Sequence, residues 1–75
     1  MELIDFISSF AGEFEETPAE KFLPDTNFRE LDEWDSLTAL SIIAMVDEKY
    51  AKQITGADIR SSTTIEELYN LVKSK

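Results

Sequence analysis

Apolar residues recur at three- and four-residue spacings in three stretches of the chain, which is the period of an amphipathic helix. The first stretch predicts a helix over residues 2–14, with an apolar face made of Leu3, Phe6, Ile7, Phe10 and Phe14. The second predicts a helix over residues 36–51, which is apolar around much of its circumference and should contact neighbours on more than one side. The third predicts a helix over about residues 65–74, with an apolar face made of Ile65, Leu68, Tyr69, Leu71 and Val72. We therefore expect three main helices that pack as a bundle.

Short polar residues mark where two of these helices begin. Asp35 is a good N-cap for the second helix, because its carboxylate can accept a hydrogen bond from a free amide of the first turn. Thr64 and Glu67 have the spacing of a capping box for the last helix. Between these two helices, residues 56–61 predict a short helical turn with Ile59 as its inward side chain.

A long connection over residues 15–34 separates the first two helices, since Pro18 and Pro24 prevent helical continuation. A loop of about 20 residues is unusual in a compact domain unless it is packed or functional. We expect its apolar side chains to hold it on the helices, namely Phe22, Leu23, Phe28, Leu31 and Trp34. No stretch gives a persuasive strand signal. The predicted fold is all-α, a small bundle of three main helices plus one short helix with a long first loop, in a single domain over residues 1–75.

Composition narrows the classes of function. A chain of 75 residues has a small core and little room for a deep pocket of roughly 300 Å³, which argues against a self-contained enzyme. The net charge of -9, from 16 acidic and 7 basic residues, would repel nucleic acid and anionic membranes. It would steer the protein towards basic partner surfaces, although acidity can also serve solubility alone.

The chain contains no cysteine and no histidine. This excludes disulfides, thiolate chemistry, Cys/His zinc sites and a Ser-His-Asp triad, so we expect neither catalytic residues nor a metal site. No run of about 18 apolar residues could span a bilayer, and no signal peptide is recognisable. We expect a monomeric, cytoplasmic protein without membrane insertion.

One segment carries a chemical motif. Asp35-Ser36-Leu37 resembles the Asp-Ser-Leu signature of acyl carrier proteins. The resemblance covers essentially the whole chain, because length, acidity, the long first loop, the short third helix and the Thr63-Thr64 pair also match. It implies an acyl-carrier-like bundle with 4'-phosphopantetheine attached covalently to Ser36, and Asp35 and Leu37 beside it. It also implies a phosphopantetheinyl transferase that takes this arm from coenzyme A and needs magnesium, and an arm whose thiol carries acyl groups as thioesters.

The position of Ser36 suits that chemistry. A helix N-terminus offers unpaired amides and partial positive charge, which favour a phosphodiester. The first helical residue is also accessible to a modifying enzyme. Because the chain offers no histidine as a base, we interpret Ser36 as an acceptor rather than a catalytic nucleophile.

The resemblance also implies that partners recognise the second helix. Acyl-loading and acyl-transferring enzymes with basic docking surfaces would contact Ile43, Ala44, Asp47 and Glu48, although the two acidic residues could equally form a solvated face. Ser41, Ala44 and Trp34 depart from the common fatty-acid type, which usually has an acidic, a larger and a small residue there. We expect Trp34 to pack on the core rather than bear on the arm. Further core residues, which in this family also line the acyl cavity, would be Ile42, Val46, Ile54, Ile59, Leu68 and Tyr69.

These departures favour a specialised pathway over the main fatty-acid pathway. The stretch from Trp34 to Leu40 is similar to free-standing bacterial carriers of surface-polysaccharide, lipid-modifying and polyketide-type systems. Two alternatives remain open. The protein could be an aminoacyl or peptidyl carrier with the same arm, or an unmodified acidic helical module that only binds partners.

Overall fold

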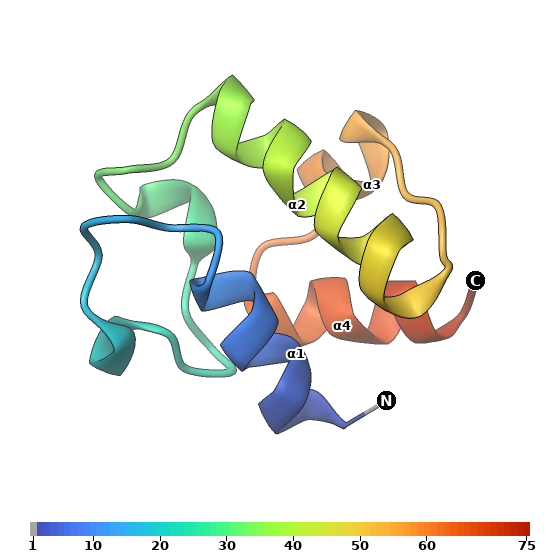
Figure 1. Cartoon of the computed structure of the whole chain (residues 1–75), viewed down its shortest axis with the longest axis horizontal. Coiled ribbons are helices and arrows are strands. Elements are labelled where there is room, and N and C mark those ends of the chain that lie inside the picture. The colour runs from blue at the N-terminus through green and yellow to red at the C-terminus, as the bar shows by residue number, and fades with distance from the viewer. Residues whose placement is uncertain (1) are drawn as a thin grey trace.

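Four α-helices and two short 3-10 turns make up the computed structural model, which describes residues 2–75 (Figure 1). The helices are α1 (Leu3–Ala11), α2 (Ser36–Tyr50), α3 (Gly56–Ser61) and α4 (Ile65–Lys73), and the 3-10 turns are Ala19–Lys21 and Phe28–Glu30. The all-α prediction of three longer helices and one short one is confirmed. Within the described residues, the only bridge of β type pairs Asn27 with Thr64. The expected domain also includes Met1, which lies outside the described residues.

The helix starts follow from local hydrogen bonds. Asp35 caps α2, and its carboxylate accepts a hydrogen bond from the Thr38 amide at 2.8 Å. The predicted capping box of α4 is present, with the Glu67 amide donating to the Thr64 hydroxyl at 3.1 Å. The short helix α3 has a second capping box, formed by a threonine and an aspartate at Thr55 and Asp58, that the sequence analysis missed.

Two helices end earlier than predicted. The first ends at Ala11 rather than at residue 14, because the chain leaves the helix through a turn in which the Phe14 amide donates to the Ala11 carbonyl. Phe14 is nevertheless buried, so its helical spacing misled the prediction of the helix end but not of the core. The second ends at Tyr50, and Ala51 closes it in the left-handed conformation at φ 55°.

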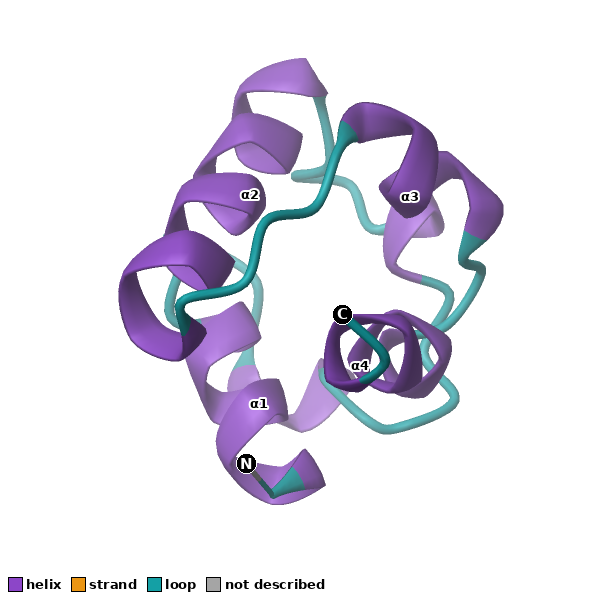
Figure 2. Ribbon diagram, turned by 90° about the vertical axis from the view of Figure 1, so that its right-hand side faces the viewer, coloured by secondary structure: helices purple, strands orange, loops and turns teal. Residues whose placement is uncertain are grey.

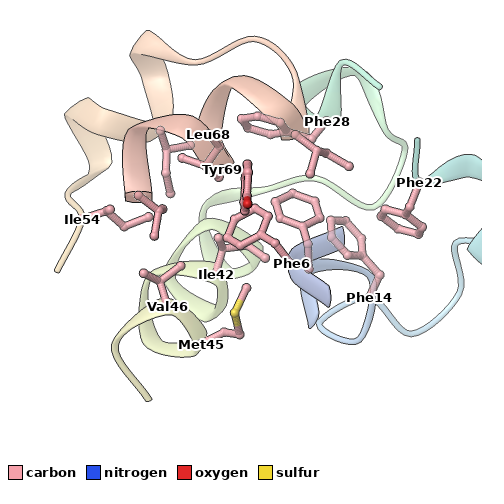
Figure 3. Close-up of a cluster of buried hydrophobic side chains, with 14 residues drawn as sticks. Phe6, Phe14, Phe22, Phe28, Ile42, Met45, Val46, Ile54, Leu68 and Tyr69 are labelled. Atoms are coloured by element: carbon pink, nitrogen blue, oxygen red, sulfur yellow. The ribbon is translucent and has the colours of Figure 1, made fainter. Parts of the chain in front are cut away.

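Aromatic side chains fill the core where α1, α4 and the first loop meet. Phe10 is fully buried, and its ring lies within 6.3 Å of five other aromatic rings, centroid to centroid. Trp34 stacks on Phe10 with an interplanar angle of 6° and contacts Phe28 at 4.9 Å, so the prediction that it packs on the core is confirmed. In Figure 3, Phe6 of α1, Tyr69 of α4 and Ile42 of α2 converge in the interior. All six further core residues predicted from sequence are buried.

The first loop is held by side chains and by the last helix. Phe22 and Phe28 are buried as predicted, whereas Leu23 is 54% exposed and does not anchor the loop. The carbonyls of Pro24 and Thr26 accept hydrogen bonds from the first amides of α4, at 3.0 and 3.2 Å. The first amides of α4, which have no hydrogen-bond partner within their own helix, therefore donate to the loop instead of to solvent. It occupies the end of the bundle at which α2 begins (Figure 1).

Helix α2 packs on both α1 and α3, as its broad apolar character predicted. Figure 2 shows α4 nearly end-on, with α1 and α2 to its left and α3 above it. The buried face of α2 consists of Ile42, Met45 and Val46, of which Met45 was not predicted. Leu37 and Leu40 are instead 72% and 60% exposed, so part of the apolar circumference faces solvent. None of the helices in residues 2–75 is long and apolar enough to cross a membrane.

Candidate functional site

Ser36 is the first residue of α2, and its side chain is exposed. Asp35 and Leu37 on either side are exposed as well, so the structure presents the whole tripeptide at the surface. Within residues 2–75 the Ser36 hydroxyl has no hydrogen-bond partner. The hydroxyl is therefore accessible at the positive end of the longest helix, where a phosphate group is favoured.

The Asp35 carboxylate is already used by the fold. It accepts hydrogen bonds from both the amide and the hydroxyl of Thr38, at 2.8 and 2.9 Å. These bonds hold the pKa of Asp35 below its usual value, against an opposing effect of desolvation and of the nearby Glu33 charge. Asp35 thus serves as an ionised cap that fixes the first turn of α2, rather than as a free base beside Ser36.

Glu33 forms a second carboxylate site, which no motif in the sequence marks. Its two oxygens accept hydrogen bonds from the amides of Glu15, Glu16 and Thr17 at 2.8 to 3.0 Å, and from the Thr17 hydroxyl at 2.6 Å. The Thr17 hydroxyl contributes most to lowering the pKa of Glu33 from 4.5 to about 2. We call this arrangement the Glu33 clamp. Because its donors lie 16 to 18 residues earlier in the chain, no local spacing pattern could reveal it.

The two carboxylate sites are joined through Thr38. Its hydroxyl contacts the main-chain carbonyl of Glu33 at 3.2 Å as well as the carboxylate of Asp35. A continuous hydrogen-bonded chain therefore runs from the first loop through Glu33 and Thr38 to the N-terminus of α2. This chain surrounds the backbone that presents Ser36.

The predicted partner residues lie on one stretch of α2. Ala44, Asp47 and Glu48 are exposed and Ile43 is half-buried. Ile43, Ala44 and Asp47 line an open hollow of about 310 Å³ together with Leu40 and residues 53–55. Leu40 was not predicted to belong to this surface, since its spacing of three and four residues from Ile43 and Ala44 fits a buried helix face equally well.

Open hollows lie on the surface of the described part of the chain. One has a volume of about 340 Å³ and is lined by residues 16–18, Lys21 and residues 30–33. Both this hollow and the one beside α2 are open depressions, so they do not enclose a ligand. No group of three or more acidic residues among residues 2–75 is arranged to hold a metal ion.

The site fits a covalent arm. An exposed serine hydroxyl without internal partners is available for a phosphodiester, and no side chain has to move to expose it. A family model described as a phosphopantetheine attachment site matches residues 3–72, which is nearly the whole chain. Comparison with curated proteins and with solved structures gave no match.

Proposed function

Because the chain belongs to the family of phosphopantetheine attachment domains, we propose that it is an acyl carrier protein and that Ser36 bears the arm. Members of this family carry a covalently attached 4'-phosphopantetheine group. The group supplies a terminal thiol on which an acyl chain can be held as a thioester. A chain without cysteine would obtain its reactive sulfur in this way.

One observation carries the assignment to Ser36, namely that its hydroxyl is exposed, unpartnered and placed at a helix start. Ser61 and Ser74 donate their hydroxyls to main-chain carbonyls, and Ser62 is buried. These three side chains are already used by the fold. Ser36 therefore combines access for a transferase with the amides and dipole that favour a phosphodiester.

The residues of this chain have limited roles in the attachment reaction. The Ser36 oxygen would form the new bond to phosphorus while the phosphoanhydride bond of coenzyme A breaks and adenosine 3',5'-bisphosphate leaves. The Ser36 proton would pass to a base on the transferase, because Asp35 is committed to its cap. The first amides of α2 offset the negative charge of the diester. The chain thus supplies an acceptor in a fixed position, while an external enzyme supplies the chemistry.

Carriers of this family interact with phosphopantetheinyl transferases and with enzymes that handle acyl groups. We place their contact on α2, where exposed Asp47 and Glu48 adjoin Ala44 and the half-buried Ile43. Charge steers a basic enzyme towards such a surface, and the apolar side chains can be buried on contact. Exposed Leu37 and Leu40 extend the apolar part of this surface towards Ser36.

We further propose that the protein serves a specialised lipid, polysaccharide or polyketide-type pathway. The uncharged Ser41 and the small, exposed Ala44 leave the middle of α2 less acidic and less bulky than in the common fatty-acid type. We also propose that the protein is located in the cytoplasm. A free thiol on the arm is preserved best where the surroundings keep thiols reduced.

Intact-mass spectrometry tests the attachment directly. The wild-type protein, incubated with coenzyme A, magnesium and a broad-specificity phosphopantetheinyl transferase, should gain the mass of one arm. Ser36→Ala should gain none, while Ser8→Ala, which changes an exposed serine of α1, should be modified like the wild type. A wild type that stays unmodified although circular dichroism shows it folded would overturn the proposal. Modification of Ser36→Ala would move the attachment to another residue.

A further inference from the structure

The segment over residues 15–17 depends on Glu33 for its order. Its three amides donate only to the Glu33 carboxylate within the described part of the chain. The side chains of Glu15 and Glu16 are exposed, so apolar burial does not hold them. Phe14 is buried just before the segment, and Pro18 follows it. The Glu33 clamp is therefore the contact that fixes the path of the chain between Phe14 and Pro18.

The charges around the clamp make its hydrogen bonds necessary. Exposed Glu16, Glu30 and Asp32 line the same hollow as Glu33, and Lys21 is the one basic residue on its wall. Like charges on the wall of one hollow repel one another. Four donated hydrogen bonds offset this repulsion at Glu33, so the acidic loop and the acidic segment before Ser36 can lie together.

The clamp is also connected to the start of α2, through the main-chain carbonyl of Glu33. The Glu33 carbonyl accepts from the Thr38 hydroxyl, and the same hydroxyl contacts the Asp35 carboxylate that caps the helix. On the other side of this backbone, the Trp34 ring is fixed against Phe10 and Phe28. A change in the path of Glu33 would therefore alter both the cap and the direction in which Ser36 is presented.

We propose that Glu33 is a positioning residue, which acts through its clamp and Thr38 to hold Ser36 in the orientation that a phosphopantetheinyl transferase requires. This inference rests on the proposed attachment at Ser36. It assigns a role to the first loop, which becomes part of the device that presents the acceptor hydroxyl. Misplacement of a reacting group by about 1 Å can lower a rate about 100-fold, so a small displacement of Ser36 would be measurable.

The test compares Glu33→Gln with Glu30→Gln. Glu33→Gln keeps the shape of the side chain but replaces one accepting oxygen by a donating NH₂ group, so the clamp cannot form in full. Glu30→Gln removes the same charge from the same hollow but breaks no hydrogen bond of the described residues. Steady-state arm transfer from coenzyme A is measured for each, with the carrier as varied substrate, at a temperature at which circular dichroism shows all variants folded.

We expect Glu33→Gln to lower kcat by about tenfold and to change the KM for the carrier less than about threefold, because the contact surface on α2 is unchanged. Glu30→Gln should change both constants less than about threefold. Thr17→Val removes the strongest donor, and its effect on kcat should not add to that of Glu33→Gln, since both act on one clamp. Amide hydrogen exchange should speed up at residues 15–17 in Glu33→Gln and remain as in the wild type in Glu30→Gln.

The outcomes separate this inference from the proposed function. If residues 15–17 exchange freely in Glu33→Gln but kcat stays as in the wild type, Glu33 holds the loop without positioning Ser36, and the inference is wrong although the carrier function stands. If Glu30→Gln slows transfer equally, charge rather than position governs the rate, and the inference is again wrong. If the wild type accepts no arm at all, both proposals fail.

Discussion

Truncation of Phe10 should destabilise the fold strongly, because this side chain joins α1 to the first loop and to the segment before Ser36. Its ring is fully buried and has five aromatic neighbours, including Trp34. Replacing a buried phenylalanine by alanine costs about 3–5 kcal/mol, since the transfer free energy is lost and a cavity remains. At about 0.05–0.15 kcal/mol per residue, a domain of 75 residues has only about 4–11 kcal/mol in total. Phe10→Ala should therefore remove about a quarter of the stability or more.

Urea unfolding followed by fluorescence measures this loss. Trp34 is the single tryptophan of the chain and stacks on Phe10, so its emission reports on the affected contact. With a denaturant dependence of about 1 kcal/mol per molar urea, the midpoint of Phe10→Ala should fall by about 3 M or more. Ile4→Ala is the matched control on the same helix. Because Ile4 is 76% exposed, its truncation should change the free energy of unfolding by less than about 0.5 kcal/mol.

A milder variant keeps the test decisive if Phe10→Ala does not fold. Phe10→Leu retains part of the volume but loses the ring contacts, so we expect a cost of about 1–2 kcal/mol. The reasoning is refuted if Phe10→Ala loses less than about 1 kcal/mol, or if Ile4→Ala is equally destabilising. Either result would mean that the aromatic cluster is not the centre of the core.

Three further predictions concern pH, a helix end and charge. The lowered pKa of Glu33 means that its contribution to stability is complete above about pH 4.5 and lost as the pH falls towards about 2. Urea midpoints measured from pH 6 to pH 2 should therefore drop more steeply for the wild type than for Glu33→Gln. Ala51→Gly should raise the melting temperature by about 4–8 °C, as measured by calorimetry. Glycine adopts the left-handed conformation of this position without the cost of about 1 kcal/mol that alanine bears. An unchanged or lower melting temperature would contradict this explanation. Asp47→Lys and Glu48→Lys should slow arm transfer more at low salt than at high salt, and an effect independent of salt would argue against electrostatic docking.

The sequence predicted the helix starts well, because each start depends on hydrogen bonds between residues that are close together in the chain. Asp35 and the Thr64-Glu67 pair fixed the starts of α2 and α4, because a cap is formed by residues three apart. The same rule would have found the Thr55-Asp58 box of α3, had a threonine followed by an aspartate been given the same weight. The end of α1 was placed too late because a buried phenylalanine can keep a helical spacing after the helix has turned away.

Contacts between distant segments could not be predicted from spacing. Leu23 and Phe22 are adjacent and both apolar, yet only the second is buried, since the path of the loop decides which one faces the core. Leu37 and Leu40 belong to the broad apolar circumference of α2, and the structure shows that they lie on its exposed side. The Glu33 clamp depends on three consecutive amides from a different part of the chain, and their approach requires the folded loop. The motif thus marks Ser36 as the proposed attachment residue, whereas the contacts around it could be described only from the structure.

The pairing of the first loop with α4 has a consequence for when the protein can be modified during its synthesis. The carbonyls of Pro24 and Thr26 are matched by the amides of Glu66 and Ile65, which a ribosome delivers much later. Contacts between segments so far apart form late, because the intervening chain must first lose entropy. A nascent chain that has exposed Ser36 but not yet residues 65–66 lacks the two hydrogen bonds that join the first loop to α4. A transferase that requires both hydrogen bonds in place would then act only after residues 65–66 have joined the first loop, so that addition of the arm follows this step of folding.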